Sequence, residues 1–320
     1  MNKTTVVIPN FNGIAYIENC LKSVYESTVP IDVIVVDNGS TDDSFGVVLR
    51  KFPKVRVIKF YENEGFCRAV NAGISMATTP YVFLLNNDTV IDPSAIEKLQ
   101  KDLDDNPNAF SVQAKMLKMS DRRMIDSAGD LYCALGWAFA LGKDKPSSRY
   151  TKMHRVFSSC AGAALYRRSI FEKIGYFDEL HFAYLEDVDV GYRSEIFGYE
   201  NYADMDALVF HAGSGASGSR YNDFKVVNSA RNSIYLIYKN MPIIQIIVNL
   251  PFLLLGYLIK ILFFARKKLL PSYMKGLKEG FLMSFSKEGR ANKIKFAFKR
   301  LGRYIIIEVK LILNIFRRLC

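Results

Sequence analysis

Short apolar runs alternate with amphipathic segments along the first 119 residues of the chain. The apolar runs predict strands at Thr4–Ile8, Val33–Val36, Val55–Lys59, Tyr81–Leu85 and Phe110–Met116. The segments between them have helical spacing and predict helices over Ile14–Glu26, Asp43–Lys51, Cys67–Met76 and Pro93–Asn106. This alternation predicts an α/β fold with a mostly parallel sheet and helices on both of its faces.

The alternation loosens between about residues 120 and 215. A single strand is predicted over Val156–Arg167, and a helix is predicted to follow Glu186. We interpret this stretch as the second half of one domain. Residues 1–119 would then face a nucleotide, and residues 120–238 would face an acceptor.

The pattern changes again from residue 239 onward. Ile243–Phe264 is mostly apolar but contains Pro251 and Lys260, and Tyr304–Leu319 also mixes apolar with basic residues. A hydrophobic stretch of about 20 residues can span a bilayer, although an internal proline and lysine make a poor span. An interfacial or re-entrant helix is the preferred interpretation; a true span and a helical cap on a soluble domain are the alternatives. Residues 239–320 are therefore predicted to form a helical membrane-association region.

The charge distribution supports this division of the chain. Residues 239–320 contain 17 Lys/Arg and 3 Asp/Glu, a net charge of +14, whereas residues 1–238 carry a net charge of −3. A basic tail rich in Leu, Ile and Phe favours an anionic membrane surface as its partner, and motifs for binding nucleic acid are missing. Five scattered cysteines and an N-terminal apolar run too short for a signal peptide indicate the reducing cytosol. We expect a peripheral or interfacially anchored protein on the cytoplasmic face of the cell membrane.

Polar clusters follow or adjoin the predicted strands of the first half. They are Pro9-Asn10-Phe11-Asn12-Gly13, Asp37-Asn38-Gly39-Ser40, the stretch from Asn63 to Gly73, and Asn86-Asn87-Asp88. Open α/β sheets bind ligands at the carboxyl ends of their strands, so these clusters predict one site. In this order they resemble the nucleotide-sugar half of the family 2 glycosyltransferases, which have a GT-A fold. The resemblance covers about residues 1–235.

Asp37 is the candidate for nucleotide recognition. At the end of a strand its carboxylate can accept hydrogen bonds from a pyrimidine base or from ribose hydroxyls, although capping a turn is the alternative role. The resemblance implies a nucleotide-sugar site that also contains Pro9, Asn12, Asn63, Gly65, Arg68, Asn71 and Asn87.

Asp88 is the candidate metal ligand, because its carboxylate suits a hard divalent cation that bridges two phosphates. Asn86 departs from the Asp-x-Asp that is commoner in the family, so Asp88 carries the charge of this segment alone. The expected cofactor is Mg²⁺ or Mn²⁺, which would neutralise the leaving diphosphate. His211 ends another predicted strand, and in related transferases a histidine at this place completes the metal site; a packing role is the alternative. The Gly/Ser run after His211 is predicted to close over the diphosphate.

Tyr184-Leu185-Glu186-Asp187-Val188-Asp189 resembles the acceptor-side motif of rhamnosyltransferase-like members of the family. An inverting displacement needs one carboxylate to deprotonate the acceptor hydroxyl while the diphosphate leaves. Adjacent carboxylates raise the pKa of one of the pair, which suits a base. We predict Asp187 as the base, Glu186 as the alternative base, and a structural role for Asp189. Arg231-Asn232 would either touch phosphate or lie on a helix surface.

The predicted function is metal-dependent, inverting transfer of a sugar from a nucleotide-diphosphate donor to a saccharide acceptor. Rhamnose is the preferred sugar and a lipid-linked saccharide the preferred acceptor, in the synthesis of a cell-surface polysaccharide. A nucleotidyltransferase would need a basic residue in a Gly-rich loop after the first strand, and Pro9–Gly13 has none. A catalytically silent nucleotide-sugar-binding assembly protein is favoured by Asn86 but opposed by Asp88, Asp187 and His211.

Overall fold

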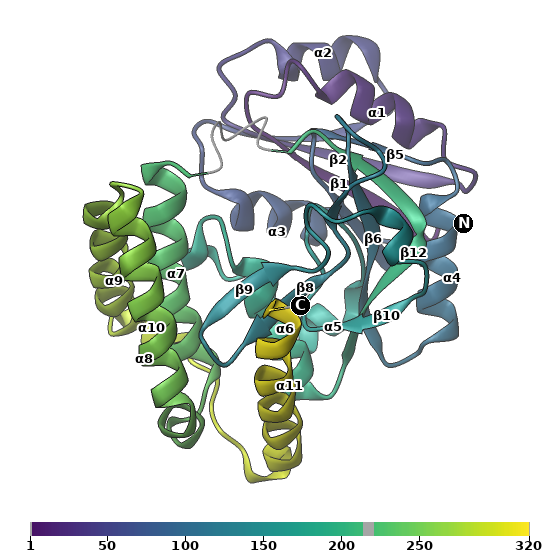
Figure 1. Ribbon diagram of the computed structural model, residues 1–320. Coiled ribbons are helices and arrows are strands. Elements are labelled where there is room, and N and C mark those ends of the chain that lie inside the picture. Colours follow the sequence, from purple (N-terminus) through teal and green to yellow (C-terminus); the bar gives the residue numbers. More distant parts are fainter. Residues whose placement is uncertain (1, 214–220, 320) are drawn as a thin grey trace.

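A ten-stranded sheet forms the centre of the computed structural model, which describes residues 2–213 and 221–319 (Figure 1). Its strands lie in the order β10-β12-β6-β11-β4-β1-β2-β3, with β5 added to β12 and β7 added to β6. The strands are β1 (Thr4–Asn10), β2 (Ile31–Asn38), β3 (Arg56–Phe60), β4 (Tyr81–Leu85), β5 (Thr89–Ile91), β6 (Ala109–Lys118), β7 (Ile125–Ser127), β10 (His154–Val156), β11 (Ala163–Arg167) and β12 (Glu200–His211).

The sheet is parallel in its first half and mixed in its second half. Strands β3, β2, β1 and β4 are parallel neighbours, as the alternating pattern predicts. Strand β11 then inserts antiparallel between β4 and β6, and β6 pairs in parallel with β12. The prediction of one strand over Val156–Arg167 is wrong. Residues 157–162 instead carry the chain from β10 at the edge of the sheet to β11 at its centre, and a turn from Cys160 to Ala163 ends the passage.

Helices cover both faces of the sheet, as predicted. Apolar residues of α1, α2 and α4 form one core with the sheet, and those of α3 and α5 form another on the opposite side. The alternating strands leave their polar ends at one edge, where the loops to the next helices begin (Figure 1). These helices are α1 (Ile17–Tyr25), α2 (Ser44–Lys51), α3 (Phe66–Met76), α4 (Ala95–Asp105), α5 (Arg168–Ile174) and α6 (Glu186–Phe197).

A small hairpin lies outside the central sheet, beside helices from the end of the chain. It consists of β8 (Asp130–Cys133) and β9 (Trp137–Ala140). The backbone N–H of Ala134 in its turn donates to Leu311, and the indole N–H of Trp137 donates to the carbonyl of Gly256 (3.1 Å). The helices of this last region are α7 (Asp223–Asn240), α8 (Ile243–Arg266), α9 (Leu270–Ser284), α10 (Lys287–Ala291) and α11 (Leu301–Leu319).

The helical region is joined to the sheet domain by packing rather than by a linker. Helices α7 and α9 approach closely at Gly276 and Gly280, where an added Cβ would lie 2.4 Å from a carbonyl oxygen of Val227 and 2.3 Å from that of Arg231. Ile307 and Leu311 of α11 are fully buried in a core shared with α6 and β8. The predicted boundary between residues 238 and 239 falls inside α7.

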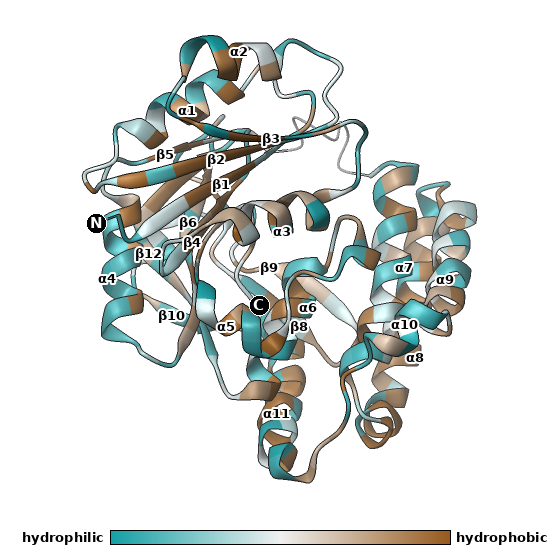
Figure 2. Ribbon diagram, turned by 180° about the vertical axis from the view of Figure 1, so that it is seen from behind, coloured by the Kyte–Doolittle hydropathy of each residue, from teal (hydrophilic) through white to brown (hydrophobic). Residues whose placement is uncertain are grey.

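The outward side of α8 and α11 is apolar. Helix α8 is, among the described residues, the one helix long and apolar enough to cross a membrane, and little of it is buried. In Figure 2, α8 shows mainly hydrophobic colouring, whereas α11 alternates hydrophobic with hydrophilic colouring. Their exposed apolar side chains are Ile243, Ile244, Ile247, Val248, Leu250, Phe252, Leu254, Leu255, Leu258, Ile259, Leu262 and Phe263 on α8, and Leu301, Ile305, Ile306, Val309, Ile312, Leu313 and Phe316 on α11.

Candidate active site

Asp88 and His211 meet at the polar edge of the sheet. Strand β12 pairs with β5 so that His211 lies opposite Thr89, the residue after Asp88. The backbone N–H of Ala212 also donates to the Asp88 carbonyl (2.9 Å). This register brings His211 Nε2 to 3.2 Å from a carboxylate oxygen of Asp88. The structure thus brings together the two residues that the sequence predicts as metal ligands.

Asp126, which sequence reasoning missed, orients this imidazole. Its carboxylate lies 2.7 Å from His211 Nδ1 and accepts from Lys143 Nζ at 2.9 Å. Burial would lower the pKa of His211, but its hydrogen bonds to Asp126 and Asp88 outweigh burial and raise the pKa to about 9. A carboxylate behind a histidine fixes which ring nitrogen faces outward. His211 Nε2 is therefore aimed at Asp88.

The Asp88–His211 pair fits a divalent cation. A carboxylate oxygen and an imidazole nitrogen supply two ligand atoms, and phosphate oxygens and water can fill the other positions. Since metal and proton compete for Nε2, binding a cation there would release the imidazole proton. Asn86 and Asn87 of the same tip have other partners: Asn86 N–H donates to Gly162 O (2.9 Å), and Asn87 Nδ2 donates to Asn10 Oδ1 (2.8 Å).

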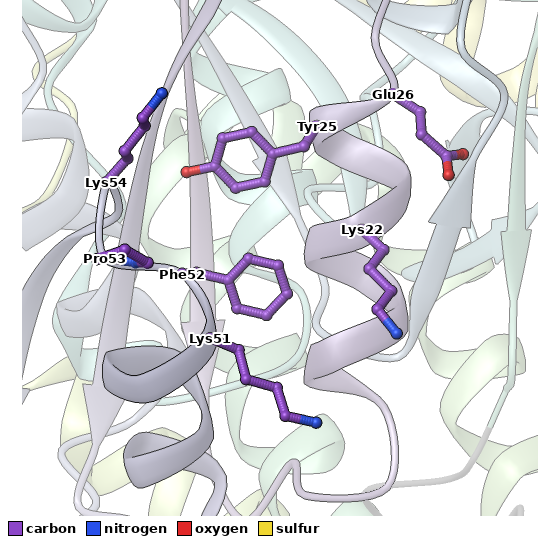
Figure 3. Close-up of a pocket in the computed structure, with 7 residues that line it drawn as sticks. All are labelled: Lys22, Tyr25, Glu26, Lys51, Phe52, Pro53 and Lys54. Atoms are coloured by element: carbon purple, nitrogen blue, oxygen red, sulfur yellow. The ribbon is translucent and has the colours of Figure 1, made fainter.

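A cavity of about 260 Å³ opens beside the pair and is lined by Lys118, Ser120, Asp126, Lys143, Asp144, His211, Ala212 and Gly213. A second cavity, of about 400 Å³, lies where α1 ends and α2 is followed by Phe52-Pro53-Lys54 (Figure 3). Its walls include the stacked rings of Tyr25 and Phe52. In an alternating α/β unit the C-terminal ends of helices lie at the edge of the sheet opposite the carboxyl ends of the strands, so the second cavity is not part of this site.

The loops after β1 and β2 are tied together around Asp37. Asp37 is fully buried, and its carboxylate accepts from Asn10 Nδ2 (3.0 Å) and from the backbone N–H of Ser40 (3.3 Å). Asn12 has a left-handed backbone (φ 50°), and its side-chain oxygen accepts from Thr41 N–H (2.8 Å). Pro9 lies within β1 beside these loops. Sequence reasoning missed Asn10 as the side chain that links Asp37 to Asn87.

The segment from Asn63 to Asn71 is fixed from both sides. Asn63 Oδ1 accepts from Asn38 Nδ2 and from Gly65 N–H, both at 3.0 Å. Gly65 has φ 89°, and a Cβ there would lie 2.7 Å from the Phe182 ring. Arg68 forms an ion pair with Glu64 and is about half exposed. Asn71 exchanges two hydrogen bonds with the backbone of Phe177 (2.8 and 3.1 Å), which ties α3 to the acceptor half.

The start of α6 carries the acceptor-side carboxylates on a strained backbone. Phe182, Tyr184 and Leu185 all have positive φ, between 60° and 73°. Non-glycine residues in this conformation cluster at functional sites, because the surrounding structure must hold them there. Glu186 is buried with one carboxylate oxygen unpartnered, and burial, together with Asp187, raises its pKa to about 8. Asp187 itself stays partly exposed.

Asp187 faces Asp130 at the start of the β8–β9 hairpin. Ligand atoms of Asp130, Asp187 and Cys160 lie within 4.8 Å of one another. Burial and the charge of the neighbouring Asp187 raise the pKa of Asp130 well above its usual range, and a hydrogen bond with Asp187 raises it further. Burial also raises the pKa of Asp187, and this hydrogen bond lowers it in part. Two adjacent carboxyl groups whose pKa values are raised suit a base that works near neutral pH.

Asp189 and the Arg231-Asn232 pair have structural partners. Asp189 is fully buried among Arg193 (2.9 Å) and Lys239 (2.9 Å), which agrees with the structural role predicted for it. Arg231 Nη2 donates to the carbonyl of His181 (2.9 Å), and Asn232 Nδ2 donates to three carbonyls between residues 181 and 184. The pair therefore holds the strained loop before α6. The predicted diphosphate-covering run after Gly213 lies outside the described residues.

Three residues of this site escaped sequence reasoning: Asp126, Asp130 and Lys143. All three lie between residues 120 and 145, where the alternating pattern loosens and gives no strand ends to search. The run Asp126-Ser127-Ala128-Gly129-Asp130 carries two carboxylates around a glycine with φ 113°. Two carboxylates around a glycine are the pattern in the sequence that could have indicated this part of the site.

A mixed sheet with helices on both faces, an Asp88–His211 pair at the carboxyl edge of its strands and the facing carboxyl groups of Asp130 and Asp187 suit a glycosyltransferase of the GT-A class. Residues 5–175 match the model of glycosyl transferase family 2, and the chain belongs to that family. The N-acetylglucosaminyl-diphospho-decaprenol L-rhamnosyltransferase of Mycobacterium tuberculosis is 27% identical over 240 residues, which cover 67% of this chain and 77% of the relative.

Solved structures share the fold. TarS 1–349 from S. aureus in complex with UDP-GlcNAc has a TM-score of 0.59 and 18% identity, over 91% of this chain and 84% of that one. The mannosyltransferase PcManGT from Pyrobaculum calidifontis, in complex with GDP-Man and Mn²⁺, has a TM-score of 0.54 and 18% identity, over 97% and 86%. The predicted GT-A fold and the predicted family are confirmed.

Proposed function

We propose that this glycosyltransferase moves rhamnose from a nucleotide-diphosphate donor to a saccharide carried by a lipid diphosphate, with inversion of the anomeric carbon. The name of the Mycobacterium tuberculosis relative supports this choice of sugar and acceptor. The observation that carries the proposal is the placement of Asp187, a partly exposed carboxylate within 4.8 Å of the Asp130 carboxyl group, whose pKa is raised by burial and by Asp187.

In the proposed reaction, Asp187 takes the proton from the acceptor hydroxyl as its oxygen attacks the anomeric carbon. The bond from that carbon to the diphosphate breaks in the same step, so the configuration inverts. Asp130 holds the Asp187 carboxylate through its donated hydrogen bond. The loops tied around Asp37 and Asn63 would hold the nucleotide, and Lys143, which contacts Asp126, places a positive charge beside the candidate metal pair.

Asp88 and His211 would hold the divalent cation, which when bound supplies positive charge to the leaving diphosphate. We propose Mn²⁺ over Mg²⁺, since Mg²⁺ strongly prefers an all-oxygen set of ligands whereas this pair offers an imidazole nitrogen.

Calorimetric binding of UDP, dTDP and GDP, with and without Mn²⁺ or Mg²⁺, tests the donor site. Tight binding of dTDP that depends on Mn²⁺ is the expected result, and His211→Ala should remove the dependence on metal. Binding of one diphosphate with equal affinity in the presence of a chelator would contradict the metal pair. Absence of metal-dependent binding to all three would favour the catalytically silent assembly protein.

The outward faces of α8 and α11 would dock this enzyme on the cytoplasmic surface of the membrane. Their exposed apolar side chains are accompanied by basic residues of the tail, which suits a bilayer with anionic lipid. Deleting residues 239–320 is a poor test, because buried Ile307 and Leu311 belong to the protein core. Replacing exposed Leu254 and Leu258 with Gln should instead lower binding to vesicles that contain anionic lipid, while Leu49→Gln, an exposed leucine of α2, should not. Equal binding by all three proteins would contradict the docking surface.

A further inference from the structure

Two basic side chains converge on the β8–β9 hairpin from different helices. Lys260 Nζ of α8 lies 5.9 Å from the centre of the Trp137 ring, and the guanidinium of Arg318 in α11 lies 5.5 Å from the centre of the Phe139 ring. Trp137 and Phe139 are alternate residues of β9 and therefore share one face of the hairpin. Both cations also act on the thiol of Cys133, the residue paired with Trp137. The two positive charges thus lie on one side of the hairpin.

Lys260 faces the protein rather than the exposed apolar side of α8. The buried residues of α8 are Gln245, Asn249, Leu253 and Gly256, and Lys260 continues this stripe at helical spacing. A lysine on the outward face could extend to the lipid surface, but this one lies between α8 and the hairpin. Burial accordingly lowers the pKa of its ammonium group to about 8. On α11, Arg318 lies one turn beyond buried Leu311 and Asn314, and it is exposed beside the Phe139 ring.

Neither cation has an anionic partner among the described residues. Lys239 and Lys310, which also face the protein in this region, each contact a carboxylate, at 2.7 Å from Asp178 and 2.5 Å from Glu195. Lys260 and Arg318 form no comparable ion pair or hydrogen bond within residues 2–213 and 221–319. A desolvated cation without a counter-ion is costly, so the position of Lys260 favours a bound anion, and exposed Arg318 adds a second positive charge on the same side of the hairpin.

The surroundings indicate what carries this anion. The outward faces of α8 and α11 are apolar, so a ligand that reaches the hairpin between them can have a lipid chain. Asp130, the partner of Asp187, opens the same hairpin three residues before Cys133, which is about 10 Å of extended strand. A sugar joined through a diphosphate to a lipid has three parts that match these surfaces. The sugar suits the Asp130–Asp187 pair, the diphosphate suits the two cations, and the lipid suits the apolar faces of α8 and α11.

We propose that Lys260 and Arg318, set against Trp137 and Phe139, bind a phosphate of the lipid-linked acceptor. This inference rests on the proposed function and adds the residues that distinguish a phosphate-bearing acceptor from a neutral one. The same chemistry could bind the headgroup of a bulk phospholipid, so the experiment must separate the two sources.

The test compares two acceptors without vesicles: N-acetylglucosaminyl diphosphate on a short alkyl chain, and the alkyl glycoside of the same sugar. For Lys260→Gln and for Arg318→Gln, we expect the ratio of kcat/KM for the diphosphate over the glycoside to fall about tenfold, mainly through KM, since a charge-assisted contact is lost. Lys260→Arg should restore most of the ratio. Arg317→Gln, which changes the neighbouring exposed arginine, is the matched control and should leave the ratio unchanged.

Three results would overturn the proposal. An equal rise of KM for both acceptors would make Lys260 a packing residue, and an unchanged ratio with weaker vesicle binding would assign the anion to bulk phospholipid. If the wild-type enzyme transfers to neither acceptor, the proposed function fails, and calorimetric binding of dodecyl diphosphate still tests the phosphate site. Equal affinity of wild type and Lys260→Gln for that probe would then reject it.

Discussion

Asp187 and Asp189 lie two residues apart on α6 and have opposite surroundings. Asp189 is fully buried and contacts Arg193, Lys239 and Asn240. Burial alone would raise its pKa, but these cations outweigh burial and hold the pKa well below its usual range. Asp187 has no cation in contact among the described residues; its neighbour is the Asp130 carboxyl group, and burial raises the pKa of Asp187.

The difference shows that two carboxylates within one helical turn can have different roles, one structural and one chemical. A carboxylate surrounded by cations and donors is a weak base, because its charge is already neutralised; it serves to fix α6 against α7. A carboxylate with no cation beside it keeps its affinity for a proton, as a general base requires. Counter-ions, rather than position in the sequence, decide which of the two carboxylates can accept a proton from an acceptor.

The largest expected effect is on activity, in Asp187→Asn. Removing the base should lower kcat by about 10² to 10⁴-fold, because general-base catalysis contributes that much. The stability should not fall, since an amide needs no counter-ion in this partly buried place. Sugar transfer and thermal unfolding of the same preparations measure both quantities, and binding of the donor diphosphate should be retained. Substantial activity in this variant would transfer the role of base to Glu186.

The largest effect on stability is expected for Lys239→Met, which removes a cation that contacts Asp189. It leaves Asp178 and Asp189 buried without their shared cation, and breaking such a pair costs about 3–5 kcal/mol. Lys101→Met removes a surface ion pair with Asp105 and should change the free energy of unfolding by less than about 1 kcal/mol. Denaturant unfolding measures both. A loss as small as that of the control would mean that Arg193 and Asn240 suffice.

The pH dependence of this loss follows from the lowered pKa values of Asp178 and Asp189. A carboxylate with a lowered pKa in the folded state stabilises the fold above its unfolded pKa of about 3.9, and this contribution disappears as the pH falls through the folded value. The difference in stability between wild type and Lys239→Met should therefore be full at neutral pH and shrink in acid. A difference that grows as the pH falls would contradict the ion network.

The sequence predicts the parts of this molecule that depend on local pattern. The strands of the parallel half and the helix after Glu186 follow from periodicity, and the pairing of Asp88 with His211 agrees with two strands that end at one edge. The insertion of β11 between β4 and β6 does not follow, because antiparallel pairing across a long connection leaves no periodic signal. The single strand predicted over Val156–Arg167 failed for the same reason.

Residues whose role depends on a partner far away in the sequence could not be predicted from the sequence either. Asp126 reaches His211 across 85 positions, and Lys239 reaches Asp178 across 61. Each of these side chains is ordinary in its local context and gains its role only when the chain folds. Asp130 matters most among these residues, because its hydrogen bond changes the pKa of Asp187, the predicted base.

The smallest effect on activity is expected for replacements of Asp130, and two of them, Asp130→Asn and Asp130→Ala, should differ in their pH–rate profiles. In Asp130→Asn the amide N–H can replace the carboxyl O–H as donor to Asp187, so activity should stay within about threefold of wild type, given that one neutral hydrogen bond is exchanged for another. In Asp130→Ala the donor is lost. The pKa of Asp187 should then rise, and the acidic limb of the pH–rate profile should move to higher pH because the base is ionised only there. Identical profiles for the two variants would show that Asp187 does not depend on a hydrogen bond from Asp130, and its basicity would then come from burial alone.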